Sequence, residues 1–113
     1  MKLYALSVSA LLIFNVILCG GPIDQDDLPA VYANNYCARA QKCDPDFDDI
    51  WVDRADCEAD WEGAVETVLD VSDLFGCDYS PEGGRQCIRA INEGNCADFL
   101  DRGDDDIECD YCD

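Results

Sequence analysis

The fold is decided by residues 53–76, which read DRADCEADWEGAVETVLDVSDLFG. Apolar residues recur in this stretch at steps of three and four, and this period predicts an amphipathic helix. Asp53 stands before the first periodic residue as an N-cap, and Gly76 supplies a left-handed stop. The predicted buried stripe of this helix is Cys57, Trp61, Ala64, Val65, Val68, Val71, Leu74 and Phe75.

The helical period continues towards the N-terminus. Residues 28–43 predict a helix that Asp27 can cap, and residues 44–49 (DPDFDD) then interrupt it. Proline excludes its predecessor from helical geometry and aspartate favours turns, so this interruption is predicted to be a loop. The predicted inner residues of the first helix are Leu28, Tyr32, Ala33, Tyr36, Cys37, Ala40 and Cys43.

Two further helices are predicted after residue 79. Ser80-Pro81-Glu82 combines a capping hydroxyl, a first-turn proline and an acid, and Gly94 ends the helix that follows. A short fourth helix is capped by Asn95 and stops at Gly103. The predicted inner residues of these two helices are Cys87, Ile88, Ala90, Ile91, Cys96, Phe99 and Leu100. The fold class is therefore all-α: a small disulfide-stabilised domain of three main helices plus a short fourth, behind a cleaved signal peptide.

The first nineteen residues resemble that signal peptide, because Lys2 precedes an apolar run that stops at Cys19. Residues 16–19 (VILC) resemble a bacterial lipobox, which would place a lipid on Cys19. Ordinary cleavage after Cys19 or Gly20 stays open, since Leu18 is bulky for a lipobox. Residues 20–27 are predicted to be a flexible acidic tether, and residues 28–113 the disulfide-rich helical domain.

Cysteine content points to an oxidising compartment, with nine cysteines in 113 residues. Removal of Cys19 leaves eight, enough for four bridges: Cys37, Cys43, Cys57, Cys77, Cys87, Cys96, Cys109 and Cys112. A straight helix would hold Cys57 about 30 Å from Cys77, which excludes that pair. An antiparallel hairpin favours Cys43 with Cys57, and proximity favours Cys77 with Cys87. The other four are expected to tie the tail to the helices, although the sequence leaves the pairing open among 105 arrangements.

Charge restricts the partners. The chain has 26 acidic and 7 basic residues and a net charge of −19, with no histidine. Nucleic acid and anionic membranes are excluded, because phosphate binding requires basic clusters. A membrane contact is expected only through a lipid at Cys19, and the partner is otherwise an unknown protein or surface. The chain has no histidine, and outside the leader it has one threonine and two serines. Because general bases and nucleophiles are so scarce, we expect that the protein is not an enzyme and has no cofactor.

The metal candidates are alternating carboxylates, the hard ligands that calcium prefers. They are Asp44, Asp46, Asp48, Asp104, Asp106 and Glu108. The first set begins like an EF-hand loop, but the sixth position is Asp49 rather than glycine and the twelfth is Ala55 rather than glutamate. A solvated acidic surface is the competing interpretation.

Three further motifs have ordinary structural explanations. Residues 109–112 have CxxC spacing, but acidic neighbours disfavour the thiolate that redox chemistry needs. Residues 102–104 spell Arg-Gly-Asp, a three-residue match of low specificity. The tryptophans and tyrosines fall mostly on predicted apolar faces, so core packing is favoured over a carbohydrate platform, with Trp51 as the exception.

The order of residues around the cysteines resembles a class of small cysteine-rich bacterial envelope proteins and candidate lipoproteins of unknown function. The resemblance covers about residues 30–100 and lies in Tyr36-Cys37, Cys43, Asp56-Cys57, residues 76–79 (GCDY), residues 87–91 (CIRAI) and Cys96. It implies a short helical disulfide domain, export and a cell-envelope location. It implies no established activity and no functional residue beyond the cysteines.

Three functions stay open at this point. The first is a non-enzymatic secreted or envelope-attached acidic protein that acts as a binding or structural module. The second is a weak extracellular calcium-binding protein, which calorimetry at millimolar calcium would test. The third is a small secreted toxin or protease inhibitor, for which residues 44–52 are the one candidate for an exposed rigid loop.

Overall fold

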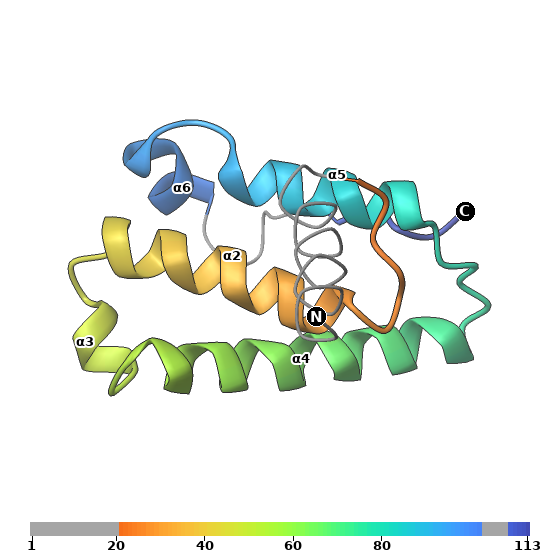
Figure 1. Cartoon of the computed structure of the whole chain (residues 1–113), viewed down its shortest axis with the longest axis horizontal. Helices are drawn as coiled ribbons and strands as arrows, with labels where there is room; N and C mark the ends of the chain where they lie inside the picture. The colour runs from red at the N-terminus through yellow and green to blue at the C-terminus, as the bar shows by residue number, and fades with distance from the viewer. Residues whose placement is uncertain (1–20, 103–108) are drawn as a thin grey trace, which may run out of the picture.

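The computed structural model describes residues 21–102 and 109–113, and helices make up most of them (Figure 1). The helices are α2 (Leu28–Cys43), α3 (Phe47–Ile50), α4 (Arg54–Leu74), α5 (Pro81–Asn92) and α6 (Cys96–Arg102). Within these ranges, extended pairing is limited to an isolated antiparallel bridge between Tyr79 and Cys112. The predicted small all-α domain is confirmed. The predicted loop at 44–49 is wrong in part, because its second half forms α3.

Helix α2 is the centre of the molecule. It runs between α4 on one side and α5 with α6 on the other (Figure 1). Helices α4 and α5 pack mainly on α2 rather than on each other. As a result, α4 and α5 flank α2 on two sides, and the candidate site lies between these two flanking helices.

Local capping sets most helix starts as predicted. The Asp53 carboxylate accepts a hydrogen bond from the Asp56 amide at 2.8 Å, and the Ser80 hydroxyl accepts one from the Gly83 amide at 3.1 Å. Gly76 has a φ of 81°, which glycine adopts at little cost, just after the end of α4. Asp27 differs from its prediction, because its side chain makes no capping hydrogen bond at the start of α2.

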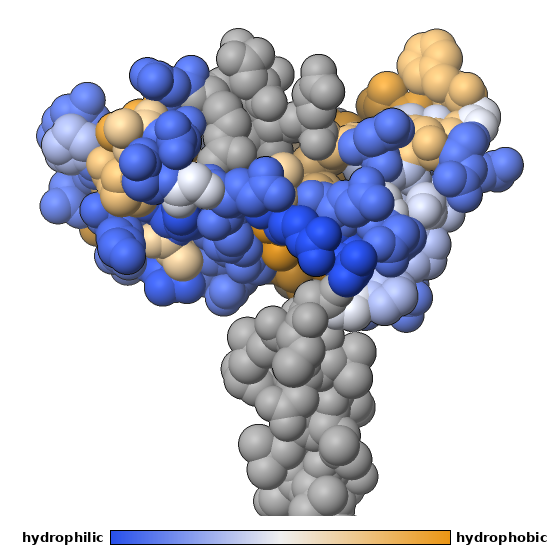
Figure 2. Space-filling model, turned by 90° about the horizontal axis from the view of Figure 1, so that it is seen from above, coloured by the Kyte–Doolittle hydropathy of each residue, from blue (hydrophilic) through white to orange (hydrophobic). Residues whose placement is uncertain are grey.

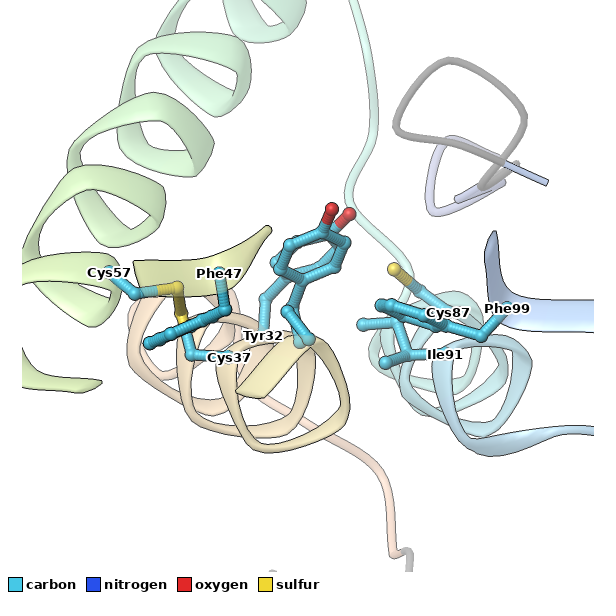
Figure 3. Packing of buried hydrophobic residues seen from close by; sticks show 9 residues of the cluster. Tyr32, Cys37, Phe47, Cys57, Cys87, Ile91 and Phe99 are labelled. Carbon is cyan, nitrogen blue, oxygen red and sulfur yellow. A yellow bond between two sulfur atoms is a disulfide. The ribbon is translucent and has the colours of Figure 1, made fainter. Parts of the chain in front are cut away.

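The core is aromatic where α2 meets its neighbours (Figure 3). The Tyr36 ring centroid lies 4.3 Å from that of Trp61 and 5.5 Å from that of Phe99, so one tyrosine joins α2 to both α4 and α6. Cys87 and Ile91 of α5 close the cluster from the other side. A second, smaller buried cluster consists of Ile23, Leu28, Leu69 and Tyr111.

Four disulfides link the helices and the tail, but they are not the pairs that the sequence favoured. The bridges are Cys37–Cys57, Cys43–Cys96, Cys77–Cys112 and Cys87–Cys109. The predicted pairs Cys43 with Cys57 and Cys77 with Cys87 are therefore wrong. The expectation that the tail is tied down holds for Cys109 and Cys112.

Helix register explains the corrected pairs. Cys57 lies one turn inside α4, so in an antiparallel hairpin it is level with Cys37, well before the last turn of α2. The end of α2 at Cys43 instead meets the start of α6 at Cys96. Cys87 lies two turns into α5, about 9 Å along the helix from Pro81, which takes it away from Cys77.

The buried stripe predicted for α4 is wrong at Ala64, which is exposed, and throughout its second half. Cys57 is fully buried, but Val68, Val71, Leu74 and Phe75 are exposed, and Leu69 is buried in their place. Helix α4 has 21 residues and α2 has 16, lengths of about 32 and about 24 Å. The longer helix therefore extends past its partner (Figure 1), and its last turns have no helix to pack against.

The N-terminal segment is ordered where a flexible tether was predicted. Ile23 is 4% exposed, and its amide donates to the Pro81 carbonyl oxygen at 3.1 Å. The Tyr79 hydroxyl donates to the Ile23 carbonyl oxygen at 2.6 Å. An apolar side chain in an otherwise polar segment was enough to fix it to the domain. The predicted signal peptide, with Cys19, lies outside the described residues.

Candidate binding groove

A cavity of about 280 Å³ lies between α4 and α5, with α2 beneath it. It is lined by Leu28, Tyr32, Trp61, Ala64, Val65, Val68, Cys87, Cys109 and Tyr111. We call these nine residues the groove. Its lining is predominantly apolar and includes no carboxylate and no cation, so the groove suits an apolar group rather than a charged one.

The groove follows from how the helices are joined. Helices α4 and α5 both pack on α2, so their own facing sides stay apart. The C-terminal tail closes one end, where the Cys87–Cys109 bridge and the Tyr111 ring contribute to the lining. The Ser80 amide donates to the Tyr111 carbonyl oxygen at 2.6 Å, which holds this wall in place.

An exposed apolar surface continues from the groove along α4. Val68, Val71, Leu74 and Phe75 are 53, 46, 84 and 87% exposed, and we call them the exposed α4 surface. Val68 belongs to both the groove and this surface. Figure 2 shows apolar residues gathered at the end of the molecule where α4 ends, beside a largely hydrophilic surface. Contiguous exposed apolar surface of this kind marks interaction sites on small proteins.

The helix that carries this surface is strongly acidic. Residues 59–75 contain five carboxylates and no lysine or arginine: Asp60, Glu62, Glu66, Asp70 and Asp73. The described ion pairs lie elsewhere, between Arg54 and Glu58 in the first turn of α4 and between Arg85 and Glu82 on α5. The second half of α4 therefore combines apolar side chains with uncompensated negative charge.

Trp61 contributes both to the core and to the groove. Its ring packs on Tyr36 and Tyr32 at centroid distances of 4.3 and 5.7 Å. Its indole nitrogen is buried, and it has no hydrogen-bond acceptor in the described part of the chain. An unsatisfied buried donor costs about 1–3 kcal/mol, so a bound group or a water that reached this nitrogen would be favoured.

Tyr79 fastens the N-terminal segment to the domain. Burial, followed by the negative charges of Asp24 and Asp27 and by Tyr111, raises the pKa of Tyr79 from 10.0 to about 12. Its hydroxyl stays protonated at neutral pH and donates to the Ile23 carbonyl oxygen. The residue is therefore a structural donor.

The calcium candidates that the structure describes, Asp44, Asp46 and Asp48, do not form a metal site. The Asp44 carboxylate accepts a hydrogen bond from the Asp46 amide at 2.9 Å, which closes a turn before α3, and Asp48 is an exposed residue of α3. In residues 21–102 and 109–113, no group of three or more histidine, cysteine or acidic side chains is placed to hold a metal ion. Asp104, Asp106 and Glu108 lie outside the described residues, as does most of the Arg-Gly-Asp motif.

Trp51 is part of the structure rather than a free platform. Its indole N–H donates to Asp60 at 3.2 Å, and its ring lies 5.2 Å from that of Phe47. The segment 44–52 is thus turned back on itself by α3 and fastened to α4. Part of the segment predicted as an exposed rigid loop, Phe47–Ile50, is therefore helical.

The sequence pattern did not indicate the groove, because most of its residues fall on predicted buried helix faces. A signal was nevertheless present in the helix lengths, since residues 53–76 predict a helix longer than the one at 28–43. The excess turns of the longer helix must leave part of its apolar stripe without a partner.

Comparison with protein-family models, with curated proteins and with solved structures gives no match for this chain. In the part of the chain that the structure describes, no helix is long and apolar enough to cross a bilayer. Four disulfides in a helical domain of this size fit a secreted or extracellular protein.

Proposed function

We propose that this chain is a non-enzymatic binding module, secreted or attached to the cell envelope, that holds an apolar segment of a protein partner. The groove and the exposed α4 surface form its binding site. The observation that carries the proposal is the continuity between the two through Val68. A disulfide framework that fixes α2, α4 and the tail would preorganise this site and reduce the entropy lost on binding.

The lining of the groove supports binding rather than catalysis. Its polar groups are two tyrosine hydroxyls and the Trp61 indole N–H, and its two cysteines are disulfide-bonded. General acid–base or nucleophilic catalysis needs a group that titrates near neutral pH or an activated nucleophile. Turnover of a substrate by the folded oxidised protein would contradict this part of the proposal.

The binding site can be tested with Nile red, a neutral dye whose emission increases in apolar surroundings. We expect the native oxidised protein to bind it, and the variant Val68→Ser/Val71→Ser/Phe75→Ser to bind at least about fivefold more weakly because it loses apolar contact area. The control is Ile50→Ser/Val52→Ser, which changes exposed apolar residues outside the groove. Equal binding by both variants, or no binding by the native protein, would remove the proposed site.

The compartment is tested by the intact mass of protein purified from its source, before and after reduction and alkylation. A lipidated start at Cys19 would support an envelope attachment, and a start at Gly20 or Gly21 would support free secretion. Either result requires that the eight remaining cysteines react only after reduction. Free thiols in the native protein would contradict an oxidising compartment.

A further inference from the structure

We infer that the partner segment is a cationic amphipathic helix, with apolar residues on one face and lysine or arginine on the other. The inference rests on the proposed function and names the chemistry of the partner. Two observations support it: the shape of the apolar surface and the negative charge of the helix that carries it. Two other occupants are less suitable: a second copy of this chain because of its charge, and a small molecule because of the volume of the cavity.

The shape suits a helix. Ala64, Val68, Val71 and Phe75 recur at steps of four, three and four, so they lie on one face of α4. This row is about 17 Å long at about 1.5 Å per residue, the length of roughly three helical turns. A second helix with apolar residues at the same spacing can place its side chains between those of the row and reach the groove beside it.

The charge selects a cationic partner. Residues 59–75 contain five carboxylates and no base, so the apolar row lies in a negative electrostatic field. Lysines or arginines on a bound helix would lie in this negative field, which speeds association and disfavours acidic competitors.

A second copy of this chain is a poor occupant. Its corresponding helix has the same apolar row and the same carboxylates, so an isologous contact would bring two acidic helices together. With a net charge of −19 on each chain, the long-range repulsion acts in the same direction.

A small apolar molecule also fits less well. A cavity of about 280 Å³ lies at the lower limit of the volumes that hold drug-sized ligands. A molecule inside it would leave the most exposed residues uncovered, because Leu74 and Phe75 are not part of its lining. A helix lying along α4 covers both the cavity and these residues.

Three synthetic peptides test the inference. The first has leucines at helical spacing i, i+3, i+4, i+7 and lysines on the opposite face. The second has glutamates in place of the lysines, and the third is a scrambled version of the first with the same composition but no apolar face. Binding to the native oxidised protein is measured by fluorescence anisotropy at about 50 and about 200 mM NaCl, two conditions that differ in Debye screening.

We expect the lysine peptide to bind at least about tenfold more tightly than the other two, and its affinity to fall several-fold at the higher salt concentration. Val68→Lys should weaken its binding by at least about tenfold, because it places a cation in the apolar row. The matched control Val52→Lys adds the same charge at a residue that is 87% exposed and outside the groove, and it should bind nearly as well as the native protein.

A charge variant separates this inference from the proposed function. Asp60→Asn/Asp70→Asn/Asp73→Asn should weaken binding of the lysine peptide several-fold and leave Nile red binding unchanged. If Nile red binds the groove but the lysine peptide binds no better than the glutamate or scrambled peptide, the inference is overturned and the binding site remains. If neither dye nor peptide responds to substitutions at Val68, the proposed function fails as well.

Discussion

Gly83 lies where the first turn of α5 meets the C-terminal tail. A β-carbon built on it would come within 2.5 Å of the Asp110 carbonyl oxygen and 2.6 Å of the Tyr111 α-carbon. These are backbone atoms held by two nearby disulfides, so they cannot move aside easily. We expect Gly83→Ala to lower the free energy of unfolding by about 1–3 kcal/mol, as over-packing typically does.

Gly63 provides the control for this substitution. No atom lies within 4 Å of a β-carbon built there, and the residue is exposed in the middle of α4. Alanine is the better helix former, so Gly63→Ala should raise the free energy of unfolding by about 0.5–1 kcal/mol. Urea denaturation of both variants measures the two values. A neutral Gly83→Ala would show that the tail does not pack against α5 as described.

Because of Tyr79, the free energy of unfolding should decrease at alkaline pH. Burial, and then Asp24 and Asp27, raise its pKa to about 12 in the folded protein, whereas an unfolded tyrosine titrates near 10. Between these values the unfolded state binds fewer protons than the folded state, so the free energy of unfolding falls as the pH rises. Below pH 10 the contribution of Tyr79 is fully present.

The measurement is urea denaturation at several pH values from 9 to 12, with the disulfides intact, on the native protein and on Tyr79→Phe. The variant loses the hydrogen bond to Ile23, worth about 1 kcal/mol, at pH 9. It should also lose stability less steeply above pH 10. Parallel pH profiles for the two proteins would contradict a raised pKa at Tyr79.

At the scale of elements, the start of α4 depends on one side chain. The Asp53 carboxylate accepts from the Asp56 amide, which otherwise has no partner in the helix. Asp53→Ala should lower the free energy of unfolding by about 1 kcal/mol. Asp70→Ala, an exposed substitution in the interior of the same helix, should be neutral or slightly stabilising because alanine favours helix. Equal losses in both variants would argue against the cap.

Helix positions could be predicted from the sequence because caps and stops act locally. Asp53, Ser80 and Gly76 each mark a boundary through contacts within three or four residues. The helix lengths indicate that part of α4 has no partner, but they do not show that Val68 and Phe75 are the exposed residues, because this depends on where α2 lies along α4. The N-terminal segment was misjudged for a similar reason, since its order rests on Ile23 contacting residues near position 80.

The disulfide pairs were beyond sequence reasoning because they depend on register between helices. An offset of six residues, or about 1.7 turns, decides whether Cys57 meets Cys43 or Cys37. The groove depends on two features that the sequence does not show. The first is where α4 extends past α2, and the second is the position of the tail, which Cys87–Cys109 and Cys77–Cys112 hold against the helices. Residue types alone predicted an apolar interior and not which part of it stays accessible.

At the scale of the whole molecule, the Cys43–Cys96 bridge closes the longest loop, with a sequence separation of 53. The chain-entropy model assigns a loop of this length about 4 kcal/mol, because the bridge restricts the unfolded state. We expect Cys43→Ala/Cys96→Ala to lose about that much stability in urea denaturation with the other three disulfides intact. A loss below about 1 kcal/mol would contradict a mainly entropic role for this bridge.

Net charge is the other property of the whole molecule that sets its stability. The chain carries a net charge of −19, and its described ion pairs are partly exposed pairs within single helices, which contribute little. Raising NaCl from about 0.05 to about 0.5 M shortens the Debye length from about 14 to about 4 Å, so it screens much more repulsion than attraction. We expect the thermal unfolding midpoint to rise by about 5 °C.

The variant Asp26→Asn/Asp49→Asn/Asp101→Asn, which removes three exposed charges, should unfold at a higher temperature in low salt, and its unfolding midpoint should rise less when salt is added. A midpoint that falls as salt is added would mean that attractive pairs outweigh repulsion, and the electrostatic argument for a cationic partner would lose its basis.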